Sequence, residues 1–117
     1  MKEADIGIDV TLEVVCGKWK GLTLWKLIHA KQLRFNELRR SLDGNISSRI
    51  LARELKKLIN DGLVERIDYE TVPPRVEYRI TPYGKTTAAF LETMNNWGIH
   101  HKSRITTREY LKEVVDE

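Results

Sequence analysis

Two short segments in the second half of the chain constrain its fold more than any other feature. Residues 63–70, LVERIDYE, and 76–81, VEYRIT, alternate apolar and polar residues as half-buried strands do. The segment TVPPR joins them, and proline cannot donate a hydrogen bond to a sheet, so Pro73 and Pro74 must lie at a turn or an edge. The sequence therefore predicts a β-hairpin with a stiff tip at residues 71–75.

A strongly two-sided helix is predicted directly before this hairpin, over about residues 47–60. Ser47 is a favourable N-cap, and Gly62 suits the left-handed position that follows a helix. Residues spaced by three and four share one side of a helix. One side carries Leu51, Leu55 and Leu58, and the opposite side carries Arg49, Arg53 and Lys56. We expect the leucine side to pack in a core and the basic side to stay outside.

The rest of the chain completes a winged helix-turn-helix layout, in which the hairpin is the wing. Helices are expected at 9–16, with Asp9 as N-cap and Gly17 after the end, at 18–30 and at 35–42, with a very short strand at 32–35. Thr81 and Pro82 should start a long helix to about residue 105, and a last short helix is expected at 107–115. The predicted fold class is mainly α with a small β-hairpin, in one domain of 117 residues with its core at about 18–81.

The charge is distributed unevenly along the chain. Residues 1–17 hold one lysine and four acidic residues, a net of −3, whereas residues 18–66 hold twelve basic and five acidic residues, a net of +7. Such an excess of basic residues is typical of proteins that bind an anionic partner, most often nucleic acid. We expect double-stranded DNA to contact the two-sided helix and the wing, through Ser47, Ser48, Arg49, Arg53, Lys56 and Arg75. An ordinary solvated helix face remains the alternative reading of the basic stripe.

The long helix carries a seam of larger residues. Tyr83, Thr87, Phe90, Met94 and Trp97 step by four and three, the spacing of a heptad seam. We expect a homodimer whose interface joins the helices at 9–16 and 82–105. The residues expected in that interface are Leu12, Val15, Tyr83, Phe90, Met94 and Trp97. The same aromatic residues could instead line a pocket for a small ligand.

Several spaced motifs resemble one family of regulators. GKWK at 17–20, RFNELRR at 34–40, IS at 46–47 followed by GLVER at 62–66, and VPPRVEYRIT at 72–81 together resemble the HxlR-type winged-helix regulators of bacteria and archaea. The resemblance covers about residues 6–98. It implies a dimeric, cytoplasmic transcription regulator that binds a roughly palindromic operator. A winged-helix adaptor that binds protein without specific DNA binding is the second hypothesis, because a fold alone does not decide function.

The single cysteine departs from the pattern of that family. Redox-sensing members of the family that this chain resembles carry a cysteine at the position of Ile6. Cys16 instead stands where that family has a glycine. We therefore expect Cys16 to be a small, half-buried structural residue. Lys18 and Lys20 lie close in sequence and would favour a thiolate, so a reactive cysteine is the alternative.

Other chemistry finds little support in the sequence. We find no phosphate-binding glycine loop and no GxSxG motif, and the adjacent His100 and His101 point about 100° apart on a helix. No enzyme activity, cofactor or metal is therefore expected. The N-terminal stretch MKEADIGIDV is acidic and lacks an apolar core, so no signal peptide is expected, and no apolar run reaches the ~20 residues of a membrane span.

Overall fold

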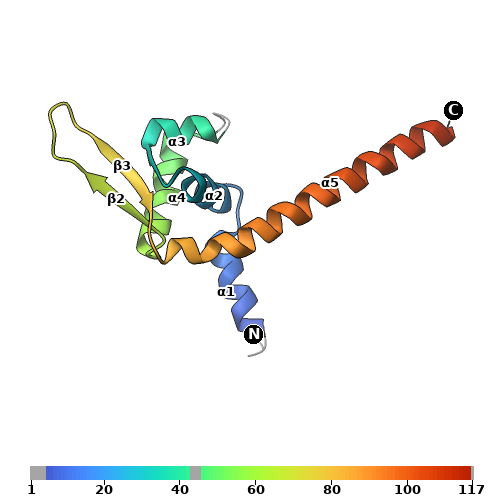
Figure 1. Cartoon of the computed structure of the whole chain (residues 1–117), viewed down its shortest axis with the longest axis horizontal. Coiled ribbons are helices and arrows are strands. Elements are labelled where there is room, and N and C mark those ends of the chain that lie inside the picture. The colour runs from blue at the N-terminus through green and yellow to red at the C-terminus, as the bar shows by residue number, and fades with distance from the viewer. Residues whose placement is uncertain (1–4, 43–45, 117) are drawn as a thin grey trace.

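The computed structural model describes residues 5–42 and 46–116, and it shows a winged helix-turn-helix with long additions at both ends (Figure 1). The elements follow one another as α1 (Ile6–Val15), α2 (Lys20–Ala30), β1 (Gln32–Arg34), α3 (Phe35–Ser41), α4 (Ser48–Asn60), β2 (Val64–Asp68), β3 (Val76–Ile80), the 3-10 helix η2 (Gly84–Thr87) and α5 (Ala88–Asp116). The predicted fold class, mainly α with a β-hairpin, is confirmed.

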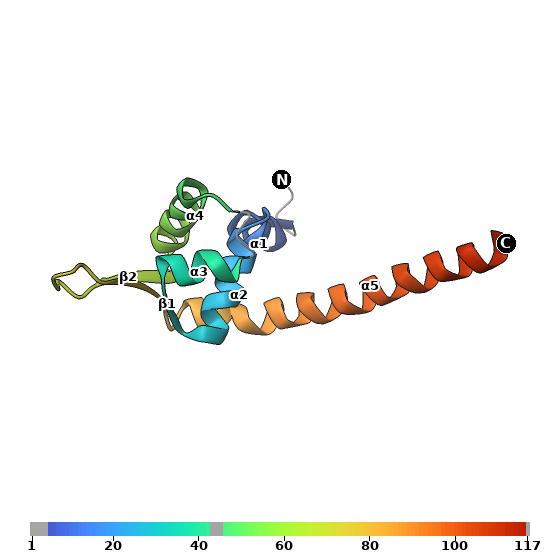
Figure 2. The ribbon, with the colours of Figure 1, turned by 90° about the horizontal axis from the view of Figure 1, so that it is seen from above.

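The three strands form one antiparallel sheet in the order β1-β3-β2. Val64 of β2 lies opposite Ile80 of β3, and Leu33 of β1 lies opposite Tyr78. Because side chains alternate along a strand, Tyr78 and Ile80 face the helices while Glu77 and Arg79 face outward. The β2–β3 hairpin extends well past the helices and forms the wing (Figures 1 and 2).

The core lies where α2, α3 and α4 meet the inner face of the sheet. Fully buried side chains come from all three helices, the loop before α4 and β2, namely Thr23, Leu24, Leu27, Leu38, Ile46, Leu51, Leu55, Leu58 and Val64. The predicted burial of the leucine side of α4 is thus confirmed. Truncating one of these leucines to alanine typically costs about 2–5 kcal/mol, so this cluster holds α2, α3 and α4 together.

The ends of α4 follow the sequence signals closely. The Ser47 hydroxyl accepts a 3.1 Å hydrogen bond from the Ile50 backbone N–H, which caps the helix as predicted. After the end of α4, Gly62 adopts the left-handed region at a φ of 77°, and Gly17 does the same after α1 at 91°.

Gly84 is required for a different reason, because an added Cβ would sit 2.1 Å from the Leu63 carbonyl oxygen.

The two terminal helices differ from their predicted bounds. α1 begins at Ile6, so Asp9 is inside the helix and does not cap it. Thr81 does cap the next segment, since its hydroxyl accepts a 2.8 Å bond from the Gly84 N–H, but the first turn is the 3-10 helix η2 and α5 starts only at Ala88. A start at Pro82 was therefore wrong.

The separate helix predicted at 107–115 was also wrong, because α5 continues without a break to Asp116. The hydroxyls of Thr106 and Thr107 donate 3.0 Å bonds back to the carbonyls of Lys102 and Ser103 within the same helix. They therefore do not cap a new one. The outer part of α5 projects far from the body (Figures 1 and 2), and the chain measures 64 × 41 × 23 Å.

Candidate nucleic-acid interface

The outward side of α4 presents the basic residues that the sequence predicted there. Arg49, Arg53 and Lys56 are all exposed, and we call them the basic surface. Ser47 and Ser48 lie at the start of the same helix and are exposed as well. Because the leucines opposite are locked in the core, the backbone that carries the basic surface is rigid, which limits the entropy lost on binding.

Part of the basic surface has a partner within the chain. The Arg53 Nε and the Lys57 Nζ each lie 3.7 Å from Oε1 of Glu54, a carboxylate that is largely buried. The Arg53 side chain remains 64% exposed, and ion pairs of this kind at a surface contribute little stability. Arg53 is consequently free to exchange Glu54 for another acceptor at small cost.

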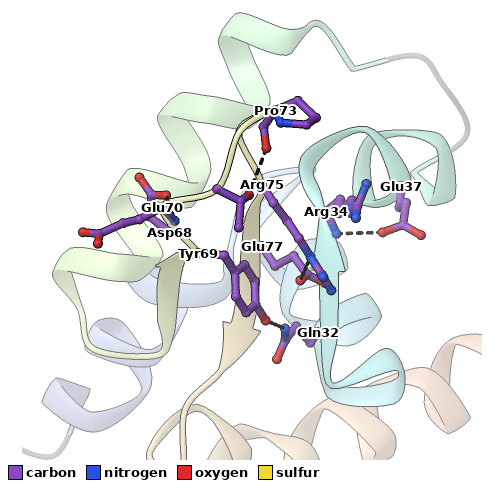
Figure 3. Close-up of polar contacts among 10 residues, drawn as sticks. Gln32, Arg34, Glu37, Asp68, Tyr69, Glu70, Pro73, Arg75 and Glu77 are labelled. Atoms are coloured by element: carbon purple, nitrogen blue, oxygen red, sulfur yellow. Dashed lines mark hydrogen bonds and ion pairs between the residues drawn. The ribbon is translucent and has the colours of Figure 1, made fainter.

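The wing places Arg75 differently from the predicted free tip. The outermost part of the hairpin is 70–74, where Val72 is 99% exposed. Arg75 lies at the start of the returning arm, its Nε donates a 3.0 Å hydrogen bond to Oε2 of Glu77, and its guanidinium stacks 4.5 Å from the ring centre of Tyr69 (Figure 3). The arginine is therefore anchored where the tip loop joins the strands, a place that we call the wing base.

A buried carboxylate organises this base. Glu77 is only 8% exposed although it faces the outer side of the sheet, because Tyr69, Arg75 and Gln32 cover it. Burial raises the pKa of Glu77, but hydrogen bonds from Tyr69 and Arg75, the Arg75 charge and a hydrogen bond from Gln32 bring the pKa below its ordinary value. The Gln32 amide also donates a 2.6 Å bond to the Tyr69 hydroxyl, so the network ties the wing to β1.

Most of the exposed large apolar side chains among the described residues lie on the two terminal helices and at the start of η2. We call this set the apolar surface, and its members are Ile6, Ile8, Val10, Leu12, Tyr83, Phe90, Met94, Trp97, Ile99, Ile105 and Leu111. Trp97 is 67% exposed and Tyr83 is 63% exposed. Of the six residues predicted for a dimer interface, five belong to this surface, whereas Val15 packs into the core of its own chain.

Cys16 is exposed, so the expected half-buried packing was wrong. The residue ends α1, where its backbone N–H bonds to the Leu12 carbonyl and its own backbone turns to an extended conformation.

The described part of the chain holds neither a metal cluster nor a membrane-spanning helix. No group of three or more His, Cys, Asp or Glu side chains there is arranged to hold a metal ion. Among the same residues, no helix combines the length and the apolar character that crossing a bilayer requires.

Sequence reasoning missed two arginines near the wing base, Arg34 and Arg40. They lie with Arg75 around one cleft between α3 and the wing. The only signal in the sequence was their place in the RFNELRR motif, and it did not show which side chain of the adjacent pair Arg39 and Arg40 points to the wing.

Comparison with known proteins agrees with this architecture. The family model described as HxlR-like helix-turn-helix matches residues 14–106. The helix-turn-helix-type transcriptional regulator YdeP of Bacillus subtilis is 39% identical over 110 residues, which span 94% of this chain and 84% of YdeP.

Solved structures give the same result. The transcriptional regulator YtcD superposes with a TM-score of 0.77 at 38% identity, covering 88% of this chain and 99% of that one. The redox regulator HypR in its reduced form gives a TM-score of 0.79 at 37% identity, covering 86% and 98%. These proteins are regulators and not enzymes. The chain belongs to the HxlR-like helix-turn-helix family of DNA-binding transcriptional regulators.

Proposed function

We propose that this protein regulates transcription as a homodimer that binds a specific, roughly palindromic double-stranded DNA operator. The α4 helix enters the major groove, and the wing contacts the backbone or the minor groove. The observation that carries the proposal is the basic surface, Arg49, Arg53 and Lys56, on a helix whose other side is fixed in the core. Arginine can donate two hydrogen bonds to one guanine, which makes it the commonest base-reading side chain.

The apolar surface supports the dimer. Apolar patches larger than a few hundred Å² are rare on monomers and mark interaction sites. Two clefts of about 260 and 300 Å³ border it, one at Val10, Val14 and Phe90 and the other at Leu22, Trp25 and Met94. Such hollows beside protruding side chains suit a second copy of the same surface, as a two-fold interface requires. The part of α5 from Phe90 to Trp97 then gains a partner.

A dimer of this kind sets a geometric expectation for the operator. Two recognition helices related by a two-fold axis read half-sites about 34 Å apart, which is one turn of DNA. The operator should therefore contain two inverted half-sites with centres about one helical turn or a multiple of it apart.

Capture of genomic fragments by the purified protein, followed by sequencing, tests the proposal. The expected result is enrichment of an inverted repeat with this spacing, bound by two protomers per duplex in light scattering. A variant with Arg49→Ala and Arg53→Ala should lose the enrichment, while Arg108→Ala, an exposed arginine near the end of α5, should keep it. Wild-type protein that enriches no sequence would contradict specific DNA binding and favour a protein-binding adaptor.

A further inference from the structure

A cleft of about 450 Å³ separates α3 from the wing, and charged side chains line it. Three arginines from different elements face it: Arg34 at the end of β1, Arg40 on α3 and Arg75 at the wing base. Asn36 and Glu37 complete its polar lining. Figure 3 shows Arg34 at the end of β1 and Arg75 just before β3, with Glu37 on α3 beside Arg34.

The fold brings these residues together through strand pairing and helix period. Arg34 pairs with Glu77 in the register of β1 and β3, so their side chains share the outer face of the sheet. Arg75 precedes Glu77 by two residues and lies toward the same face. Asn36 and Arg40 are four residues apart on α3 and so share one side of that helix.

The three arginines differ in the interactions that they already make within the chain. The Arg75 Nε donates to Glu77, and the two terminal amino groups, with four N–H donors, have no hydrogen-bond acceptor among the described residues. The neighbouring Arg39 has a structural task, because its Nε donates a 2.9 Å bond to the Ile46 carbonyl. Neither Arg34 nor Arg40 makes an ion pair through its side chain within the described residues.

The charge balance of the cleft favours an anion. Glu37 lines it, and its Oε1 accepts a 2.9 Å hydrogen bond from the Arg34 backbone N–H. Counting Glu37 and the adjacent Glu77 against the three arginines still leaves a net positive charge. Planar guanidinium groups that converge on one space match the oxygens of a phosphate group, to which they donate in pairs.

We propose that this cleft binds a backbone phosphate of the DNA duplex that α4 reads, with Arg34, Arg40 and Arg75 as the donors. The inference rests on the proposed function and adds Arg34 and Arg40 to the DNA-contacting residues. Glu77 and Tyr69 act as positioning residues, since they hold the Arg75 guanidinium at the cleft before DNA arrives. A phosphate contact fixes the orientation of the protein on the duplex and carries no sequence information of its own.

Salt titrations of binding to a mixed-sequence duplex, long enough for two half-sites, test the proposal. Losing one phosphate contact should reduce the slope of log affinity against log salt by about one unit and lower affinity at 0.15 M salt by about fivefold. We expect this of Arg34→Ala and of Arg40→Ala. Arg108→Ala, which removes an exposed arginine far along α5, is the matched control and should change neither quantity.

Two further variants separate a bound phosphate from a general positive field. Arg34→Lys should restore the salt slope but only part of the affinity, because lysine keeps the charge and lacks the planar fork. Glu37→Gln should strengthen binding, since it removes the carboxylate that lines the cleft while an amide oxygen still accepts from the Arg34 N–H. Thermal unfolding of each variant should match that of the wild type.

The outcomes that overturn the proposal are distinct. If Arg34→Ala and Arg40→Ala behave as Arg108→Ala does, while the wild type binds DNA, the cleft holds no phosphate and the proposed function still stands. A lysine variant equal to the wild type in affinity would indicate a general field and would also overturn the site. Wild-type protein that binds no duplex at all would overturn the proposed function, and this inference with it.

Discussion

The basic surface on α4 and the apolar surface on α1, η2 and α5 are both exposed in the single chain, but at very different cost. Arginine and lysine side chains are well solvated, so the basic surface is stable in water without a partner. Fully burying one large apolar side chain is worth about 1.5–3 kcal/mol, so a surface with Trp97, Met94 and Phe90 exposed is stabilised when covered. The first surface is thus available for an occasional partner, and the second calls for a permanent one.

This difference predicts that charge placed in the apolar surface separates the protomers and, through loss of the dimer, weakens DNA binding. A double substitution, Met94→Glu and Trp97→Glu, places two charges in the apolar surface, and central interface residues contribute about 2–4 kcal/mol each. We expect a monomer with native helix content and a much weakened affinity for DNA. Sedimentation and circular dichroism provide the measurement, with Lys102→Glu on the same helix as the control for added negative charge. A double variant that remains dimeric would place the interface elsewhere.

A smaller effect, on stability, is expected at the wing base, where the Glu77 carboxylate is buried. The folded pKa of Glu77 lies below its ordinary value of 4.5, so the charged network stabilises the wing above that pH. This stabilisation is lost as pH falls through the lowered pKa. Thermal unfolding of the wild type and of Glu77→Gln should differ at neutral pH and converge in acid. A difference that persists unchanged at low pH would show that the charge of Glu77 plays no part.

The smallest effect is expected at Cys16, which lies outside the basic surface and outside the core. Substitution at an exposed position usually changes stability by less than about 0.5 kcal/mol, so Cys16→Ser should unfold as the wild type does. We expect DNA binding and its response to the thiol oxidant diamide to be unchanged as well. Release of the wild type from DNA by diamide, without release of Cys16→Ser, would instead make the protein a thiol sensor.

What the sequence predicted correctly depends on local period and local caps. The leucine and arginine sides of α4 follow from a spacing of three and four, and the Ser47 cap follows from its place before the stripe. The hairpin follows from strict alternation between turn residues. Each of these signals lies within a few residues of the element that it specifies.

The misses depend on how separate elements meet. The pairing of Arg75 with Glu77 under Tyr69 and Gln32 requires the register of β1 against β3, which no local pattern gives. The exposure of Cys16 depends on how the end of α1 is set against α2. The unbroken course of α5 was missed because Thr107 can cap a new helix or bond back within an existing one, and sequence alone does not distinguish the two.

We propose that α4 reads base sequence while the wing base holds the DNA backbone. Fluorescence anisotropy on a duplex enriched from genomic DNA and on its shuffled counterpart tests it most directly. Arg49→Ala and Arg53→Ala should each reduce discrimination between the two duplexes by about 1–3 kcal/mol. Arg75→Ala should weaken both duplexes equally. If all three variants lose affinity for the two duplexes in the same proportion, the division between base reading and backbone contact is contradicted.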